Sequence, residues 1–320
     1  MYKPTTCSIE LLRKCCLRCR MCYMWNPQHR EVCIEKSVLY SIASQLRDLL
    51  SGDKEVVFSG GEPLLYDGIA EIVALYSREG LKVGMASNGV MIDRQIADDI
   101  VKAGLRNIQL SLDSCVRQTH DFLRGVQGAY DRLLKGAECL LVYKSSLSVC
   151  AQTVISESNI NEIADTVEFV ARDNRFDLIS FMAITDPFFS QANDTWREKG
   201  KFSYLWPKSK KQIDRAIDDL IKMKQSGYPI ANPVSHLELF RYYFHNPYDR
   251  KPETMCCLGD YVINIDPACD VRLCCFMDPI GSIKQKTLTD ILGSEDIVKI
   301  RSAMKNCEKT CNTLVNCFFK

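Results

Sequence analysis

The 320-residue sequence has no long apolar run, almost no net charge and no low-complexity segment. A membrane-spanning helix needs about 18 consecutive apolar residues, and no stretch here approaches that length. Residues 1–6 lack the apolar stretch of a signal peptide. Lys and Arg number 41 against 40 Asp and Glu, so charge predicts no nucleic-acid or polyanion partner. We therefore expect a cytoplasmic protein without a membrane or nucleic-acid partner.

The chain has 17 cysteines, and they are unevenly placed. Five lie within residues 1–22, eight within 256–317, and four between. A disulfide scaffold is one interpretation, but such proteins are short and secreted. In a reducing compartment, clustered thiols more often bind metal than pair with each other. The two clusters therefore predict metal sites near both ends of the chain.

Apolar runs of β character alternate with amphipathic helical windows over the first 185 residues. The runs cover residues 6–11, 55–59, 81–87, 107–112, 147–155 and 177–184. One helical stripe is formed by Val38, Ile42, Leu46 and Leu49, with Ser37 as the expected N-cap. Six strand–helix units predict an α/β fold with a parallel sheet and right-handed crossovers, open or closed into a barrel.

Three segments are expected along the chain. Residues 1–185 form the α/β unit, 186–255 form a connector with a helix over 209–226, and 256–320 form a Cys-rich module. Residues 261–266 and 271–275 of that module predict a β-hairpin. Aromatic side chains of the connector either line a substrate mouth or pack as a linker, namely Phe188, Phe189, Trp196, Tyr204 and Trp206.

Cys15, Cys19 and Cys22 follow the first predicted strand with CxxxCxxC spacing. Three thiolates on one loop can hold three irons of a 4Fe–4S cubane and leave the fourth iron open. The alternative is zinc, with Cys16 as the fourth thiol. Zinc sites of this kind usually offer two CxxC pairs, whereas here three ligands crowd one loop. The spacing therefore favours an iron–sulfur cluster.

Three further polar motifs come directly after predicted strands. Gly60-Gly61-Glu62-Pro63 follows the second, Ser87-Asn88-Gly89 the third and Ser111-Leu112-Asp113 the fourth, with Arg124 in the next helical window. Glycines let the backbone approach a ligand closely, and arginine matches a carboxylate. In parallel α/β sheets and barrels, ligands bind at the carboxyl ends of strands. These motifs therefore predict one site shared with the cysteine loop.

The cysteine spacing, with Met21 and Tyr23 beside Cys22, and the ordered strand-end motifs resemble the radical S-adenosylmethionine (SAM) superfamily over about residues 5–185. The resemblance implies a partial (β/α)6 TIM-like barrel with a 4Fe–4S cluster on the three cysteines. It implies that GGEP binds the methionine amino group, that Ser87 and Asn88 lie at the ribose, and that Ser111 and Arg124 bind the carboxylate. The implied SAM-binding set is Tyr23, Gly60, Gly61, Glu62, Pro63, Ser87, Asn88, Ser111 and Arg124.

The C-terminal cysteines form a second pattern. Cys256-Cys257-Leu-Gly, a predicted hairpin with Asp266-Pro267, and a cysteine at its end resemble the SPASM and twitch modules, which hold auxiliary 4Fe–4S clusters. The resemblance implies one auxiliary cluster on four of the candidate ligands Cys256, Cys274, Cys307, Cys311 and Cys317.

Two departures and one alternative accompany this assignment. The family's hairpin usually has glycine where Cys269 stands. Cys257 and Cys275 duplicate candidate ligands by one position, and because adjacent strand residues face opposite ways, only one of each pair can point at the cluster. A structural zinc site is the alternative, since four thiolates suit it equally.

The resemblance implies reductive cleavage of SAM to a 5′-deoxyadenosyl radical that abstracts hydrogen from a peptide or small metabolite, for oxidation or cross-link formation in a maturation pathway. The auxiliary cluster would assist electron transfer, and a flavodoxin or ferredoxin would supply electrons. Candidates for substrate contact, by predicted position alone, are Cys150, Gln152, Asp186 and His236. A non-catalytic iron–sulfur electron-transfer or sensor protein and a zinc-stabilised binding module are the alternatives, and neither requires the SAM motifs.

Overall fold

The computed structural model describes residues 3–26, 32–187, 190, 195–249, 256–274 and 276–307. Its scaffold is a nine-stranded sheet in the order β6-β5-β4-β3-β2-β1-β7-β8-β9. The first six strands are mutually parallel, which confirms the predicted (β/α)6 arrangement. They are β1 (Thr6–Glu10), β2 (Glu55–Ser59), β3 (Lys82–Ser87), β4 (Leu105–Ser111), β5 (Ser148–Ile155) and β6 (Leu178–Ala183).

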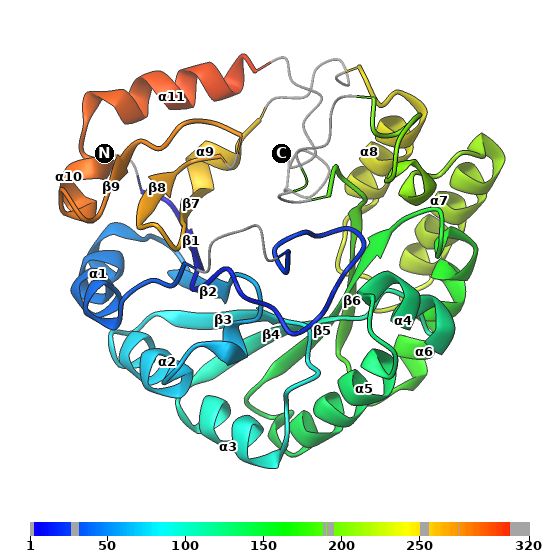
Figure 1. Ribbon diagram of the computed structural model, residues 1–320, viewed down its shortest axis with the longest axis horizontal. Helices are drawn as coiled ribbons and strands as arrows, with labels where there is room; N and C mark the ends of the chain where they lie inside the picture. The colour runs from blue at the N-terminus through cyan, green and yellow to red at the C-terminus, as the bar shows by residue number, and fades with distance from the viewer. Residues whose placement is uncertain are drawn as a thin grey trace.

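Helices cover the outer, convex side of this sheet (Figure 1). They are α1 (Lys36–Leu49), α2 (Ile69–Arg78), α3 (Arg94–Lys102), α4 (Arg117–Arg124), α5 (Ala129–Leu140) and α6 (Ile163–Arg172). Short 3₁₀ turns accompany them at Pro63–Leu65, Leu141–Tyr143, Ile160–Glu162 and Ser203–Leu205. The strands bury alternate residues on the helix side because successive strand residues face opposite sides of a sheet. In β5, for example, Val149, Ala151, Thr153 and Ile155 are buried, and the residues between them are half-buried.

The expected N-cap of the first helix is wrong. Helix α1 begins at Lys36 and Glu35 is its N-cap, without a side-chain capping bond. The Ser37 hydroxyl lies 3.4 Å from a carboxylate oxygen of Glu35, so it does not cap a backbone N–H. The helix therefore starts two residues earlier than the serine suggested.

The inner, concave face of the sheet is polar and open. Gln109 lies in the middle of β4, between β3 and β5, and is nevertheless exposed, whereas Ile108 and Leu110 on the helix side are fully buried. The cysteine loop that follows β1 lies on this inner side (Figure 1). The fold thus brings the cysteine loop and the carboxyl ends of the strands to one hollow.

The C-terminal module continues the barrel sheet. Strand β7 (Val262–Ile265) pairs in parallel with β1, and β8 (Asp270–Arg272) and β9 (Gly281–Ser282) follow it as antiparallel neighbours. The predicted hairpin is therefore confirmed. Helices α9 (Leu258–Tyr261), α10 (Leu288–Leu292) and α11 (Glu295–Lys305) complete the described part of the module.

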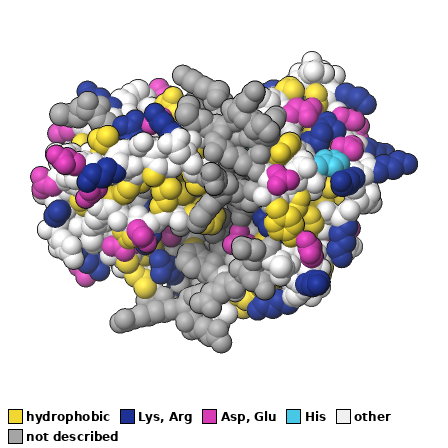
Figure 2. Space-filling view, turned by 90° about the horizontal axis from the view of Figure 1, so that it is seen from above, with side chains coloured by type: hydrophobic (Ala, Val, Ile, Leu, Met, Phe, Trp, Pro, Cys, Tyr) yellow, Lys and Arg dark blue, Asp and Glu magenta, His cyan; other side chains and the backbone are white. Residues whose placement is uncertain are grey.

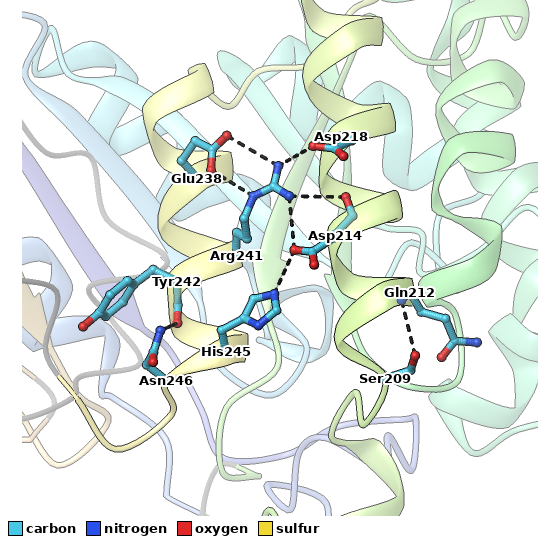
Figure 3. Close-up of polar contacts among 9 residues, drawn as sticks. All are labelled: Ser209, Gln212, Asp214, Asp218, Glu238, Arg241, Tyr242, His245 and Asn246. Atoms are coloured by element: carbon cyan, nitrogen blue, oxygen red, sulfur yellow. Dashed lines mark hydrogen bonds and ion pairs between the residues drawn. The ribbon is translucent and has the colours of Figure 1, made fainter.

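Helices α7 (Lys210–Gln225) and α8 (Val234–His245) form an antiparallel pair beyond β6 (Figure 1). The predicted connector helix corresponds to α7. Arg241 of α8 contacts Asp214 and Asp218 of α7 at 3.2 and 2.6 Å (Figure 3). It also contacts Glu238 of its own helix at 3.0 Å, and His245 Nε2 lies 2.8 Å from Asp214. This charge network joins the two helices at their surface.

The connector aromatics that the structure describes are packed rather than open. Trp196 and Trp206 are buried and meet edge to face with ring centroids 5.7 Å apart, and Trp206 also contacts Tyr243 at 5.2 Å. The guanidinium of Arg197 lies among these rings and donates to the Tyr243 hydroxyl at 3.3 Å. Phe188 and Phe189 lie outside the described residues. No helix within the described ranges is long and apolar enough to cross a membrane.

Candidate active site

The cysteine loop is attached to the end of β2 by backbone hydrogen bonds. The Leu11 N–H donates to Ser59 O at 2.9 Å, the Gly61 N–H to Leu12 O at 2.8 Å, and the Glu62 N–H to Lys14 O at 2.8 Å. These bonds continue the pairing of β1 with β2 beyond the strands themselves. The GGEP segment therefore lies directly against the residues that lead into Cys15.

Glycine is needed at this contact because the two backbones touch. A Cβ atom on Gly61 would clash with the carbonyl of Lys14, and one on Gly60, whose φ is +132°, would clash with Leu12 O. Gly125, at φ +67°, fits equally closely against Arg18 O on the other side of the loop. The loop is thus held between two glycine contacts, one after β2 and one after α4.

Amide and guanidinium groups point at the thiols of the loop. Asn88 Nδ2, after β3, lies 3.8 Å from Cys15 Sγ and 3.4 Å from Cys16 Sγ. Arg124 Nη1, at the end of α4, lies 3.8 Å from Cys19 Sγ. Burial raises the pKa of the Cys19 thiol, and Arg124 opposes that shift. These donors favour a thiolate over a neutral thiol.

Cys19 is close enough to the other two predicted ligands for its charge to raise the pKa of both the Cys15 and the Cys22 thiol. Cys16 lies beside Cys15, and a hydrogen bond from Cys15 lowers the pKa of the Cys16 thiol to about 6. The choice of Cys15 over Cys16 as a ligand therefore remains a prediction from spacing.

Arg124 is held by a carboxylate that the sequence did not single out. Its Nε lies 2.7 Å from Asp113 Oδ2, and both side chains are almost fully buried. The Val154 N–H donates to the other oxygen of Asp113 at 3.2 Å. Asn159 donates from its amide to Asp113 O at 2.7 Å, and His120 Nδ1 accepts from the Asp113 N–H at 3.3 Å. Arg124 is therefore fixed from the ends of β4 and β5.

Glu62 connects the ends of β2 and β3. Its fully buried carboxylate accepts from the Ser87 hydroxyl at 2.7 Å, the Asn88 N–H at 2.8 Å and the Leu64 N–H at 3.2 Å. Burial raises the pKa of Glu62 to about 7 in spite of these donors. In this structure the side chain positions the Ser87–Asn88 turn, and its predicted contact with a methionine amino group stays a prediction.

The remaining predicted SAM-binding residues surround the same hollow. The Ser111 hydroxyl donates to Ser87 O at 3.3 Å, which links β4 to β3. Pro63 is buried at the start of a 3₁₀ turn. Tyr23 packs edge to face on Phe202, with ring centroids 5.2 Å apart, and the Lys201 ammonium lies 4.9 Å from the Tyr23 ring. The connector therefore reaches the cysteine loop, which the sequence did not predict.

A row of polar side chains crosses the inner face at the level of these motifs. Ser111, Gln152 and Ser180 are consecutive partners across β4, β5 and β6, and Gln109 pairs with Cys150 one level below. The Ser180 hydroxyl donates to Gln152 Oε1 at 2.7 Å. His236, by contrast, is buried on α8 against Phe240 and Asn232. Of the positional candidates, Cys150 and Gln152 face the hollow and His236 does not.

The described C-terminal cysteines lie at the ends of the helices and strands of the module. Cys256 and Cys257 precede α9, and Cys257 is its N-cap, so the strand argument used to choose between them does not apply. Gly259 of α9 packs so closely on Met304 of α11 that a Cβ there would lie 2.5 Å from the sulfur. Cys307 follows α11, and Cys274 lies just beyond β8. Cys275, Cys311 and Cys317 lie outside the described residues.

The donor set of the cysteine loop fits the cluster that the resemblance implies there. Thiolates are the soft ligands that iron–sulfur clusters and zinc prefer, and the loop surrounds its thiols with amide and guanidinium donors rather than carboxylates. Within the described ranges, no three His, Cys, Asp or Glu side chains converge closely enough to hold a single metal ion.

A partial α/β barrel with a thiol-bearing loop at the carboxyl ends of its strands defines a class of metal-cofactor enzymes. The model of the Radical SAM superfamily matches residues 9–170, half of the chain, and the chain therefore belongs to that superfamily. Its members are enzymes that use a 4Fe–4S cluster and SAM. The matched range holds the cysteine loop and all three strand-end motifs.

Individual relatives differ in what they act on. Fe-coproporphyrin III synthase of Methanosarcina barkeri is 30% identical over 156 residues, 48% of this chain and 38% of that protein. The sporulation killing factor maturation protein SkfB of Bacillus subtilis is 28% identical over 177 residues, 55% of this chain and 42% of SkfB. The chain thus covers less than half of the length of these curated relatives.

The fold likeness extends over the C-terminal module. The structure of Streptococcus suis SuiB bound to S-adenosylmethionine superposes with a TM-score of 0.72 at 18% identity, covering 98% of this chain and 75% of SuiB. SuiB bound to its precursor peptide SuiA gives a TM-score of 0.71 at the same identity, covering 99% of this chain and 74% of SuiB. At this identity the likeness concerns the fold, barrel and hairpin module together.

Proposed function

We propose that this chain cleaves SAM reductively and uses the resulting 5′-deoxyadenosyl radical to abstract hydrogen from a peptide, with an auxiliary 4Fe–4S cluster assisting electron transfer. Cys15, Cys19 and Cys22 would hold the cluster that supplies the electron for this cleavage. Four of Cys256, Cys274, Cys307, Cys311 and Cys317 would hold the auxiliary cluster.

The observation that carries the proposal is the convergence of the strand-end motifs on the cysteine loop. Gly61 bonds to the backbone that leads into Cys15, Asn88 points at the Cys15 thiol, and Arg124 points at the Cys19 thiol. A purely electron-transferring iron–sulfur protein has no use for these motifs. We infer that these motifs orient a polar ligand beside the loop and that Asp113 holds the Arg124 side chain in place.

A peptide is the substrate class that we favour over a small metabolite. The inner face carries amide and hydroxyl side chains, including Gln109, Gln152 and Ser180, which can pair with the N–H and C=O groups of a peptide backbone. SkfB is a maturation protein for a killing factor, and SuiB has been solved with a precursor peptide. Fe-coproporphyrin III synthase makes a small-metabolite substrate the alternative.

Anaerobic reconstitution with iron and sulfide tests the enzyme assignment. We expect about eight irons per chain, for two 4Fe–4S clusters, and formation of 5′-deoxyadenosine when dithionite and SAM are added. About four irons would contradict the auxiliary cluster. Absence of 5′-deoxyadenosine from the fully loaded chain would contradict the enzyme assignment and favour the electron-transfer or sensor alternative, and binding of zinc in place of iron would favour the zinc-stabilised module.

A pair of adjacent variants tests the ligand assignment. Cys15→Ala should abolish SAM cleavage and remove about four irons per chain, whereas Cys16→Ala should keep both, because only Cys15 has the spacing of a ligand. The two thiols lie side by side at Asn88, so Cys16→Ala is a matched control for local packing. The opposite result would transfer the ligand role to Cys16.

We also propose a small one-electron carrier such as flavodoxin or ferredoxin as the reductant. A cytoplasmic location remains a prediction, which rests on the need for reduced cysteines as cluster ligands.

A further inference from the structure

Four arginines and one exposed aromatic ring lie on the cysteine loop and on helices α4 and α5 next to it. We call this set the arginine surface: Arg18, Arg20, Arg117, Phe122 and Arg132. Phe122 on α4 is 42% exposed, although it is a large apolar side chain. A groove of about 450 Å³ runs beside it, lined by Arg20, Arg117, Gln118 and Phe122 among others.

This surface is directly attached to the loop that carries the predicted cluster ligands. Arg18 and Arg20 flank Cys19. The backbone N–H of Arg18 donates to Arg124 O at 3.1 Å, and the backbone N–H of Arg20 donates to Leu123 O at 2.9 Å. Arg132 of α5 donates from its Nε to Gly128 O at 3.2 Å, and the Gly128 N–H bonds to Asp121, which lines the groove. The surface is therefore the outside of the loop whose inside faces the hollow.

The positive charge of the arginine surface is only partly balanced. Arg18 donates to the carbonyls of Cys15 and Leu17, and Arg20 donates to Phe122 O, so in the described part of the chain neither meets a carboxylate. Arg117 pairs with Asp131 at 2.8 Å, and both side chains are more than half exposed.

Asp121 is the acidic residue that lines the groove. The carboxylate of Asp121 accepts hydrogen bonds from the backbone N–H groups of Gly128 and Tyr130, at 2.7 and 2.8 Å. Among the residues that the structure describes, Arg117 is the one arginine of the four with an ion pair to a carboxylate, in a chain whose net charge is only +1. Such a local excess attracts an acidic partner by long-range electrostatics.

The aromatic ring adds a contact for a planar apolar group. The Arg20 guanidinium lies 4.0 Å from the centroid of the Phe122 ring and covers one face of it, while Tyr204 meets it edge to face at 6.3 Å. The exposed part of the ring borders the groove. A flavin presents a flat apolar edge at the surface of a carrier protein, and stacking on an aromatic side chain suits it.

We propose that the arginine surface docks a small acidic flavoprotein of the flavodoxin type, which delivers the electron for SAM cleavage. One electron would pass from the reduced flavin to the cluster on the loop, so that the flavin is oxidised by one electron and the cluster is reduced by one electron. The inference rests on the proposed function and names the surface through which its electron enters. Contacts of this kind are small and short-lived, and electron-transfer encounters typically bury less than about 1,200 Å².

The test combines binding with two sources of electrons. In the variant Arg117→Glu/Arg132→Glu, affinity for an acidic flavodoxin should fall at least about tenfold at low salt, and the salt dependence of binding should weaken. The same variant should form 5′-deoxyadenosine at the wild-type rate with dithionite, which needs no docking, and at least about tenfold more slowly with reduced flavodoxin. Phe122→Ser should weaken binding without changing its salt dependence, because the ring is uncharged.

The matched control is Arg172→Glu/Arg215→Glu, which reverses two charges on α6 and α7 whose side chains are 81% and 85% exposed. It should bind flavodoxin as the wild type does. The proposal would be overturned if the control bound flavodoxin as weakly as the Arg117→Glu/Arg132→Glu variant, or if flavodoxin-driven turnover of that variant were undiminished. It would also be overturned if the wild-type protein accepted electrons from a ferredoxin but not from a flavodoxin. A wild-type chain inactive with dithionite would contradict the proposed function instead, and the binding measurements would still decide the docking surface.

Discussion

Gly61 lies where the backbone after β2 crosses the cysteine loop, and its φ is ordinary, so only the lack of space requires glycine there. We predict that Gly61→Ala lowers the free energy of unfolding by about 2 kcal/mol or more and reduces the iron incorporated per chain, because the Lys14 carbonyl must move. Urea unfolding and iron analysis measure the two effects.

Gly84→Ala is the control for the Gly61 prediction. Gly84 lies in β3 with its nearest neighbours 3.5–3.8 Å from a Cβ position, so an added methyl group fits. Equal losses of stability in the two variants would show that the contact with the cysteine loop is not special.

Cys269 occupies the hairpin position where glycine is usual in the related modules, and its φ is +73°. An L-residue in this left-handed region is strained by about 1–2 kcal/mol relative to glycine. We therefore predict that Cys269→Gly is more stable than Cys269→Ala by about 1 kcal/mol, the reverse of the usual order in a strand or helix. Comparing the two variants removes the shared loss of the buried thiol, and thermal or urea unfolding measures the difference. An alanine variant at least as stable as the glycine one would contradict the strain.

The buried imidazole of His120 should make the folded chain less stable in acid. Burial lowers the pKa of His120 to about 3, against a usual value near 6.5, so the unfolded chain binds a proton in this range that the folded chain does not. Its contribution to stability is complete above pH 6.5 and should fall by about 1.4 kcal/mol per pH unit below it. The difference in unfolding free energy between wild type and His120→Gln, measured from pH 7.5 to 5, should shrink as the pH falls. A difference independent of pH would show that folding does not lower the pKa of His120.

The residues near the site divide into those with a sequence signal and those without. Cys15, Gly61 and Arg124 lie in spaced motifs, and the structure brings them together. Asp113 was visible only as the end of Ser-Leu-Asp, and Asn159 and His120 carried no signal. Their partners lie 7 to 46 residues away along the chain, so local pattern does not connect them. Sequence reasoning finds groups whose spacing is fixed locally, and it misses groups that hold them from other elements.

At the scale of elements, α7 and α8 are joined by Arg241, whose side chain is 22% exposed and meets three carboxylates (Figure 3). We predict that Arg241→Met lowers the free energy of unfolding by about 1 kcal/mol at low salt, and by less at high salt, because three partly exposed carboxylates lose their common cation. Urea unfolding at two salt concentrations measures this.

The control for Arg241 is Arg215→Met. Arg215 is 85% exposed, and its one ion pair among the described residues is with Asp219, at 3.8 Å on its own helix, so its loss should change stability by less than about 0.5 kcal/mol. Similar losses at both positions, or no salt dependence at Arg241, would mean that the network contributes nothing beyond an ordinary surface arginine.

Strands were predictable because each one buries a full row of residues on the helix side. In β5 the alternation Val149, Ala151, Thr153 and Ile155 is buried, and its predicted range differs from the observed one by a single residue. The start of α1 was wrong, since Ser37 bonds to a neighbouring side chain. The pairing of β7 with β1 was not predictable either, because residues about 255 positions apart meet there and no local pattern specifies a partner.

At the scale of the whole molecule, the C-terminal module and helices α7 and α8 lie on opposite sides of the barrel (Figure 1). Seen from above, hydrophobic side chains gather on the sides of these groups that face the middle, whereas charged side chains lie more toward the outer flanks (Figure 2). The barrel strands and the C-terminal module share one sheet, since β1 has β2 on one side and β7 on the other. The hairpin module is therefore an extension of the barrel in its hydrogen bonding, although its sequence reads as a separate segment.

This continuity predicts that the barrel and the hairpin module unfold together. Ile263 of β7 is fully buried beside Cys7 of β1, and Ile263→Ala should cost about 2–4 kcal/mol. When the variant and the wild type carry the same number of clusters, hydrogen exchange should be faster in the variant in β1 and β2 as well as in β7 and β8. The reason is that the loss of β7 leaves β1 as a sheet edge. Val298→Ala, at a position 64% exposed on α11, should leave exchange unchanged throughout. Faster exchange confined to the residues after 256 would show instead that the module opens independently, and that the barrel alone holds the cysteine loop in place.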